Sequence, residues 1–103
     1  MTAPGAEDLR RLAGLDKVIH EPGRLAIVSY LAVVAEADFL FLLDLTQMTR
    51  GNMSSHLGKL EQAGYIDVDK AFVDRVPRTT YRLTPTGREA FDAYRTDLLG
   101  SLQ

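Results

Sequence analysis

The chain has 103 residues, 46% of them hydrophobic and 25% charged, which predicts a single domain with a modest core and a net charge of −2. The absence of cysteine excludes disulfides, thiolate metal sites and thiol redox chemistry. No signal-peptide-like start and no run of roughly 20 apolar residues is present, so we expect a cytoplasmic protein that does not span a membrane.

Three helices are predicted in the first half of the chain. Residues 1–8 lack a periodic pattern and are expected to be flexible, and an apolar stripe then predicts a helix from Asp8 to about His20. The sequence Glu-Pro-Gly at 21–23 breaks this helix, and a second one is expected from Pro22 to between Ala35 and Asp38. The apolar run FLFLLDLTQ at 39–47 predicts a short third helix, entered through one extended residue at Phe39.

The next segment, residues 50–66, predicts a helix with two unlike faces. Met53, Leu57, Leu60 and Gly64 recur at spacings of three and four and therefore share one face. The other side is small and polar: Gly51, Asn52, Ser54, Ser55, His56, Gly58, Lys59 and Gln62. Thr49 is a suitable N-cap, and Gly64 suits the left-handed backbone at a helix end. Together with the third helix, this segment predicts a helix-turn-helix.

Alternation then replaces the helical period. Ile66 and Val68 are expected to point inward on a first strand, and Tyr81 and Leu83 on a second strand at 80–84. Residues 74–78 between them are expected to form a hairpin tip that Pro77 stiffens. Thr84 and Pro85 then predict the start of a last helix, and its apolar stripe contains Phe91, Tyr94, Leu98 and Leu102.

Charge is distributed unevenly along the chain. Residues 49–82 hold six basic and four acidic side chains, a net charge of +2, which leaves −4 for the remainder. A negative protein is by itself a poor partner for nucleic acid, but this asymmetry can present one positive face to a polyanion.

Three segments carry a resemblance: LDKVIHEPGRLAIVSYL at 15–31, GNMSSHLGKLEQAGYI at 51–66 and RVPRTTYRLTPTGREAF at 75–91. They resemble the winged-helix DNA-binding domains of small bacterial and archaeal transcriptional regulators related to the MarR and ArsR families. The resemblance implies a mainly α fold with a small β hairpin, in which a three-helix core is followed by a two-stranded wing and a C-terminal helix. It implies one domain over residues 1–103, with residues 85–103 as a dimerisation helix. It also implies a homodimer on a pseudo-palindromic operator in double-stranded DNA.

The resemblance also implies residue roles. The recognition helix and its start would contact bases and phosphates through Thr49, Arg50, Asn52, Ser54, Ser55, His56 and Lys59. The wing would contribute Lys70, Arg75, Arg78, Thr79 and Thr80, and the dimer interface Leu9, Leu12, Phe91, Tyr94, Leu98 and Leu102. The sequence departs from the family at Gly58, where a basic residue is usual, and at the apolar positions Leu40, Phe41 and Leu43.

Each feature also has a simpler interpretation. The polar helix face is compatible with plain solvation, His56 with a half-buried structural histidine, and the two wing arginines with a solubilising loop. Leu40, Phe41 and Leu43 are expected to be buried within the chain, the alternative being a surface for a partner or effector. No metal, cofactor or catalytic motif is apparent, and His56 beside Ser54 and Ser55 lacks an orienting carboxylate. A protein-interaction module without specific DNA binding is the main alternative function, and any small-molecule effector is unknown.

Overall fold

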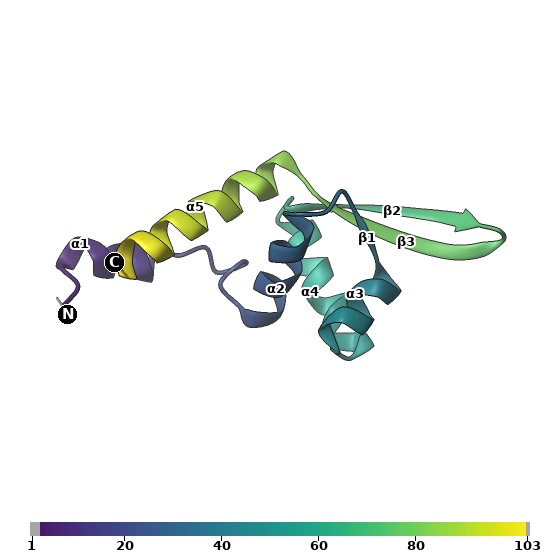
Figure 1. Ribbon diagram of the computed structural model, residues 1–103, viewed down its shortest axis with the longest axis horizontal. Coiled ribbons are helices and arrows are strands. Elements are labelled where there is room, and N and C mark those ends of the chain that lie inside the picture. The colour runs from purple at the N-terminus through teal and green to yellow at the C-terminus, as the bar shows by residue number, and fades with distance from the viewer. Residues whose placement is uncertain (1–2, 103) are drawn as a thin grey trace.

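The protein is elongated, with a helical body between two projections. The computed structural model describes residues 3–102 and measures 58 × 26 × 21 Å. These residues form α1 (Ala6–Ala13), α2 (Pro22–Leu31), β1 (Ala37–Asp38), α3 (Phe39–Thr46), α4 (Arg50–Gln62), β2 (Ile66–Val73), β3 (Val76–Leu83) and α5 (Pro85–Leu102). The β2–β3 hairpin projects from one end, and α5 with α1 from the other (Figure 1). The predicted fold class, a winged helix-turn-helix, is confirmed. In the part of the chain that the structure describes, no helix is long and apolar enough to cross a membrane.

The first two helices are shorter than predicted. α1 begins at Ala6 and ends at Ala13, not at His20, because Gly14 caps it and Asp16 then organises a turn. The Oδ1 atom of Asp16 accepts the backbone N–H groups of Val18 at 2.8 Å and Ile19 at 3.2 Å. The apolar stripe was therefore partly misassigned, since Leu15 and Ile19 are buried from a loop.

α2 ends at Leu31 because the chain is diverted into a third strand that the sequence did not predict. Ala37 and Asp38 of β1 pair antiparallel with Tyr81 and Thr80 of β3, so the helix cannot continue toward Asp38. Asp38 then caps α3 by accepting the backbone N–H of Phe41 at 2.7 Å. The extended residue before α3 is thus Asp38, and Phe39 is already helical.

α4 matches its prediction closely. The Thr49 hydroxyl oxygen accepts the backbone N–H of Asn52 at 3.1 Å, as an N-cap should. Met53, Leu57 and Leu60 are buried, and Gly64 adopts a φ of 79° just beyond the helix end. The face of α4 opposite these three residues therefore points away from the core.

The sheet has the strand order β1–β3–β2, and its hairpin is longer than predicted. Pro77 does not lie in the tip but in β3, opposite Phe72 of β2. The tip is the two-residue turn Asp74–Arg75, whose φ angles of 51° and 67° correspond to the type I′ turn that suits twisted hairpins. Ile66, Val68, Tyr81 and Leu83 are buried or half-buried at the base, which confirms the predicted alternation.

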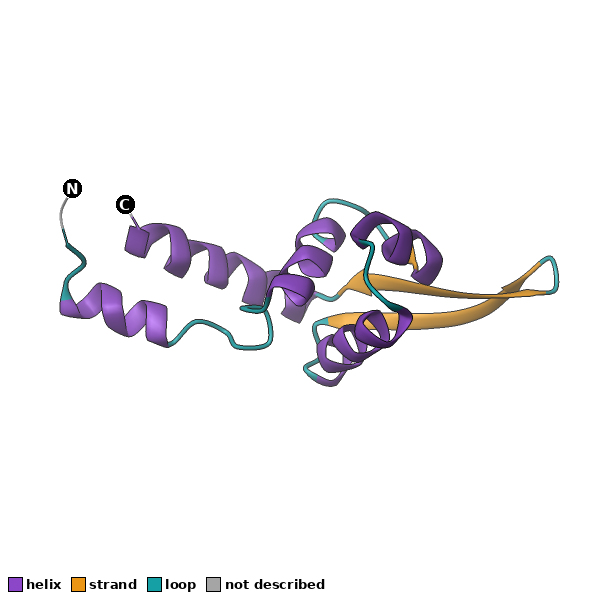
Figure 2. Ribbon diagram, turned by 90° about the horizontal axis from the view of Figure 1, so that it is seen from below, coloured by secondary structure: helices purple, strands orange, loops and turns teal. Residues whose placement is uncertain are grey.

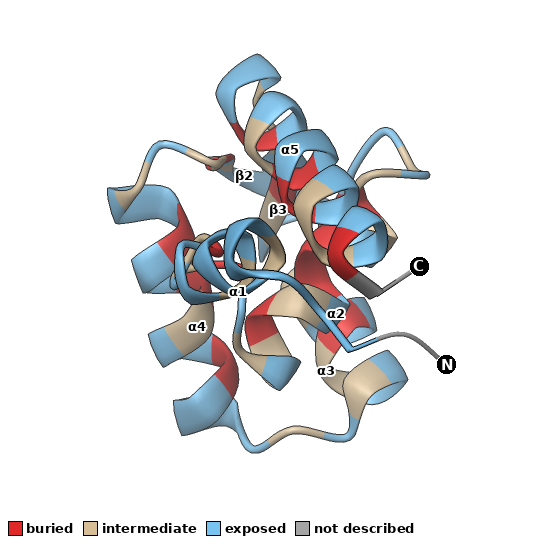
Figure 3. Cartoon of the chain, turned by 90° about the vertical axis from the view of Figure 1, so that its left-hand side faces the viewer, coloured by how far each residue is buried: buried red, intermediate tan, exposed pale blue. Residues whose placement is uncertain are grey.

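A single core lies where α2, α4, the base of the hairpin and the first half of α5 meet (Figure 3). Its fully buried members include Ile19, Ile27, Leu31, Leu42, Met53, Leu60 and Ile66. α1 has no buried residue and lies against α5, away from this core (Figures 1 and 2). The core thus holds α4 firmly, whereas α1 adds little to it.

The start of α5 is tied to the end of α4. Thr84 caps α5 as predicted, since its hydroxyl oxygen accepts the backbone N–H of Gly87 at 2.9 Å, and the hydroxyl donates to the Gly64 carbonyl at 2.7 Å. The backbone N–H of Thr84 donates to the Tyr65 carbonyl at 3.0 Å. A Cβ atom at Gly87 would overlap that same carbonyl, so only glycine allows this approach.

Candidate nucleic-acid interface

The outward face of α4 presents polar side chains to solvent. Of the residues predicted to contact DNA, those on or just before this helix that are exposed are Thr49, Arg50, Asn52, Ser54, Ser55 and Lys59. They stand over the buried side chains of Met53, Leu57 and Leu60, which fix the position of the helix. Gly58 lies on the same open surface, where an added Cβ atom would meet no other atom within 4 Å. The hydrogen-bond donors and acceptors on this face of the helix are therefore free to contact another molecule, because none of them is needed for packing in the core.

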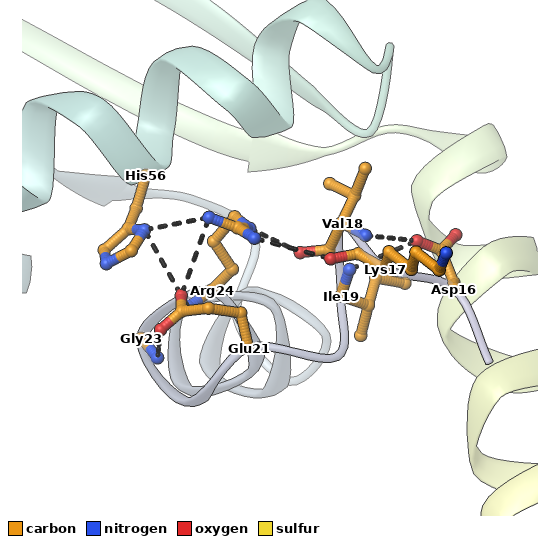
Figure 4. Close-up of polar contacts among 8 residues, drawn as sticks. All are labelled: Asp16, Lys17, Val18, Ile19, Glu21, Gly23, Arg24 and His56. Carbon is orange, nitrogen blue, oxygen red and sulfur yellow. Dashed lines mark hydrogen bonds and ion pairs between the residues drawn. The ribbon is translucent and has the colours of Figure 1, made fainter. Parts of the chain in front are cut away.

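His56 lies differently from the side chains around it. Its Nδ1 atom is 3.3 Å from the Glu21 carboxylate and 3.2 Å from Nη1 of Arg24, and its side chain is only 20% exposed (Figure 4). A Cβ atom at Gly23 would lie 2.6 Å from its Nε2 atom, so the ring also packs closely on the first turn of α2. His56 therefore connects α4 to α2, in line with the half-buried interpretation and not with a side chain that faces bases.

The sequence analysis missed the partners of His56, and its expectation that no carboxylate orients this ring is wrong, because the Glu21 carboxylate lies 3.3 Å from Nδ1. Arg24 is only 9% exposed, and its guanidinium donates to the carbonyl oxygens of Val18 and, at 3.4 Å, Lys17. The Glu21 carboxylate caps α2 by accepting the backbone N–H groups of Gly23 at 2.9 Å and Arg24 at 3.0 Å. An acidic residue directly before a proline at the first helical position was the available signal for this cap.

The same contacts set the ionisation of Glu21. Partial burial acts to raise its pKa, but the hydrogen bonds from Gly23 and Arg24 and the charges of His56 and Arg24 outweigh it, so the pKa lies below 4.5. The carboxylate is therefore ionised at neutral pH, as its role as acceptor requires.

A second pair, Tyr65 and Asp16, holds the far end of α4. The Tyr65 hydroxyl donates a hydrogen bond to the Asp16 carboxylate. This bond, together with partial burial and the charge of Asp16, raises the pKa of Tyr65 to about 12. The loop between α1 and α2 is thus attached to α4 at two places, through Arg24 and His56 and through Asp16 and Tyr65.

The wing carries the predicted basic residues, but not all at its tip. Lys70, Arg75 and Arg78 are exposed, whereas Thr79 and Thr80 are half-buried. Arg75 lies in the turn, but Arg78 lies within β3, where its guanidinium is 3.3 Å from the Asp38 carboxylate. The prediction that both arginines flank the tip is therefore wrong for Arg78, because the hairpin is longer than expected.

A cleft of about 630 Å³ lies between the wing and the starts of α3 and α4. It is lined by Asp38, Phe39, Leu40, Arg50, Val73, Val76, Pro77, Arg78, Thr79 and Tyr81. Arg50 stands on the helix side, 6.0 Å above the Phe39 ring, and Arg78 on the wing side. α4 and the wing thus border one cleft with a guanidinium group on each side.

The apolar residues of α3 are less buried than predicted. Leu42 is the fully buried residue of this helix and Leu43 is half-buried, whereas Leu40 is 62% and Phe41 48% exposed. The burial interpretation is therefore wrong for Leu40 and Phe41, because a helix on the surface can bury only one stripe of a run that is apolar all round.

The predicted dimer residues fall into two groups. Phe91 and Tyr94 are 8% and 3% exposed within the single chain, and the Tyr94 hydroxyl lies 2.8 Å from Nδ1 of His20, so they belong to the core of the protomer. Leu12 and Leu98 are half-buried and Leu9 is 54% exposed. Leu99, which the prediction omitted, is 50% exposed on α5. The side chain of Leu102 lies outside what the structure describes.

Comparison with known proteins agrees with this geometry. An uncharacterised protein of Methanocaldococcus jannaschii is 29% identical over 83 residues, which cover 81% of this chain and 90% of that protein. A transcriptional regulator homologue from Pyrococcus horikoshii OT3 superposes with a TM-score of 0.85 at 28% identity, over 93% of this chain and 94% of that one.

More distant structures share the fold alone. The transcriptional repressor BigR from Xylella fastidiosa has a TM-score of 0.66 at 21% identity, over 94% of this chain and 92% of that one. A MarR-family regulator from Porphyromonas gingivalis W83 has a TM-score of 0.67 at 15% identity, over 100% and 98%. The family model of the winged helix DNA-binding domain matches residues 24–100, from α2 to the last turns of α5. This chain therefore belongs to the winged-helix DNA-binding domain family, and its structural neighbours include MarR-family regulators.

Proposed function

We propose that the protein binds double-stranded DNA as a homodimeric transcriptional regulator in the cytoplasm, with α4 in the major groove and the wing on the adjacent minor groove. The observation that carries the proposal is the pairing of the exposed polar face of α4 with a basic hairpin across one cleft. The Pyrococcus protein is described as a transcriptional regulator homologue, which supports a regulatory role.

Base contacts are assigned to the outermost polar groups of α4. Asn52 is the side chain best suited to read a base, because an amide can pair bidentately with adenine. Ser54 and Ser55 add donors and acceptors, and Lys59 supplies a phosphate contact one to two turns further along. Thr49 and the free backbone N–H groups at the start of α4 suit a phosphate, with Arg50 beside them. His56 is absent from this set because it is engaged with Glu21 and Arg24.

The wing has the length that the minor groove requires. From Val68 at its half-buried base to Val73 beside the turn, the hairpin extends about 17 Å at the usual rise per strand residue. Half a helical turn of DNA, which separates the centres of the two grooves, is also about 17 Å. Lys70, Arg75 and Arg78 would supply phosphate contacts, and Thr79 and Thr80 lie nearer the base.

The dimer is assigned to α1 and α5. Leu9 and Leu99 expose apolar surface on these two helices, and Leu12 and Leu98 border it. Two-fold symmetry then predicts a pseudo-palindromic site with half-sites about one helical turn apart.

The test is selection of genomic fragments by the purified protein at low and at physiological salt. Enriched fragments that share an inverted repeat support the proposal, and retention without a shared motif at low salt alone would reduce it to nonspecific binding. Retention at neither salt would contradict it and favour a protein partner on the exposed Leu40 and Phe41.

A double variant, Arg75→Ala with Arg78→Ala, tests the wing. We expect weaker binding to every duplex and a salt dependence lower by about one to two released ions. The matched control is Arg88→Ala with Arg95→Ala, which removes the same charge from α5. An unchanged salt slope in the wing variant, or an equal change in the control, would remove the wing from the interface.

A further inference from the structure

The end of the wing is apolar on both faces. Phe72 lies opposite Pro77, and Val73 lies opposite Val76 in the next pair. Because successive strand residues point to opposite faces, the first pair occupies one face of the ribbon and the second pair the other. Phe72 is 76%, Val76 62% and Val73 46% exposed.

These side chains lie outside the core, and within the chain they contribute only the cross-strand pairs Phe72–Pro77 and Val73–Val76. Every residue from Asp69 to Arg78 is exposed, so within the described residues nothing covers the tip. Hairpin ends with no packing role are normally polar, and clustered exposed apolar side chains on a soluble protein mark a contact with another molecule.

The charge around the tip indicates what that molecule is. Residues 69–78 contain three basic side chains, Lys70, Arg75 and Arg78, and two acidic side chains, Asp69 and Asp74, a net charge of +1, and Arg78 lies 3.3 Å from the Asp38 carboxylate. The excess charge at the tip is positive, so a second copy of the tip would meet like charge, which is unfavourable. A polyanion with apolar surface inside its charged rim fits both features, and the minor groove of DNA has this character, since deoxyribose C–H groups line its walls between two rows of phosphates.

On the basis of the function proposed above, we propose that the wing tip is an apolar wedge that enters the minor groove, where Phe72 packs against the sugars and partly unstacks one base step. The whole ribbon is too wide for a groove about 6 Å across, because its two strands lie about 4.8 Å apart and carry side chains on both faces. Only the side chains next to the two-residue turn would therefore enter the groove, which widens as they do. Apolar side chains inserted from the minor groove act in this way in architectural proteins. Arg75, in the turn itself, would reach the groove floor or a phosphate ahead of the wedge.

The experiment uses the full chain and a duplex of roughly 30 base pairs, recovered by fragment selection and carrying 2-aminopurine at adenines half a turn from each recognition site. We expect the wild-type protein to raise the 2-aminopurine fluorescence on binding. Phe72→Ala should abolish that rise and weaken binding about tenfold, with an unchanged salt slope because no ionic contact is lost. Phe41→Ala is the matched control, since it removes an exposed phenyl ring from α3 and should leave the fluorescence rise intact.

Several results would overturn the wedge. Phe72→Ala with wild-type affinity and fluorescence would do so while leaving DNA binding by the protein intact, and a double variant, Val73→Ser with Val76→Ser, checks the opposite face in the same way. A lower salt slope in Phe72→Ala would mean that the variant has displaced the wing arginines, and the effect would not be that of a wedge. Sedimentation showing wild-type association that Phe72→Ala abolishes, without DNA, would assign the tip to a second copy. If the wild-type protein retains no duplex at all, the proposed function itself is contradicted, and the wedge with it.

Discussion

The recognition helix and the wing, both assigned to the same DNA, are built in opposite ways. α4 is held by three buried apolar side chains, by an N-cap at Thr49 and by the contact of His56 with α2. The distal wing is held by cross-strand pairing and by the ion pair of Arg78 with Asp38, and its side chains from Asp69 to Arg78 are exposed.

The difference shows how to interpret an apolar residue in each place. On α4 an apolar residue serves the fold, so its presence carries no information about a partner. On the distal wing no core has to be filled, so the exposed area of Phe72, Val73 and Val76 beyond their cross-strand pairs points to a contact outside the chain. Polar residues reverse this logic, since Arg24 and His56 are polar and yet belong to the framework.

The largest expected difference between the two elements is in the free energy of unfolding after truncation of one apolar side chain in each. Leu60→Ala is expected to lower the free energy of unfolding by about 3 kcal/mol, because it opens a cavity beneath α4. Val73→Ala, at the exposed tip, should change it by less than about 0.5 kcal/mol. Urea denaturation measures both values, and a loss above about 1 kcal/mol in the wing variant would show that the tip is packed in solution.

Tyr65→Phe probes how the end of α4 is held. Loss of the hydrogen bond to Asp16 should cost about 1.5 to 3 kcal/mol at neutral pH, the value for a bond to a charged group. Because the folded pKa is raised to about 12 from 10, this contribution is complete below pH 10 and is lost as the pH rises through 12. Stability should therefore fall less steeply in Tyr65→Phe than in the wild type over that range. Parallel curves from thermal or urea unfolding at each pH would contradict the assignment.

Substitution of Gly58 is expected to have the smallest effect, and this effect is a gain in stability. Since nothing lies near its Cβ position, Gly58→Ala should raise stability by about 0.5 to 1 kcal/mol through helix propensity. Gly58→Arg should bring a similar gain and also tighter, more salt-dependent DNA binding. Equal affinity of the alanine and arginine variants for DNA would place this position outside the interface.

Local patterns were sufficient for much of the fold. The N-caps at Thr49 and Thr84, the buried face of α4 and the left-handed Gly64 follow from a few neighbouring residues, and each was predicted. The order of helices and strands followed from these signals, apart from the two-residue β1.

Long-range contacts were not visible in the same way. β1 exists because Ala37 and Asp38 pair with residues more than 40 positions away, and the early end of α2 is a consequence. Asp74 is a common residue in such a turn, but Arg75 adopts positive φ without being glycine or asparagine, so the local signal for the true tip was weak. For the site, the exposed polar face of α4 was predictable from periodicity. The inward turn of His56 was not, because its partners lie 32 and 35 positions earlier in the chain.

The glycine at the start of α5 has a mechanical consequence. α5 has 18 residues and is about 27 Å long, and its direction is set by the contact of Gly87 with the Tyr65 carbonyl and by Phe91 and Tyr94 in the core. A difference of about 10° in that direction would displace the far end of the helix by about 5 Å. In a dimer joined through the far ends, the same rotation would alter the separation of the two recognition helices relative to the fixed pitch of DNA. The close contact at Gly87 and the hydrogen bonds of Thr84 would then determine which distance between operator half-sites the dimer can bind.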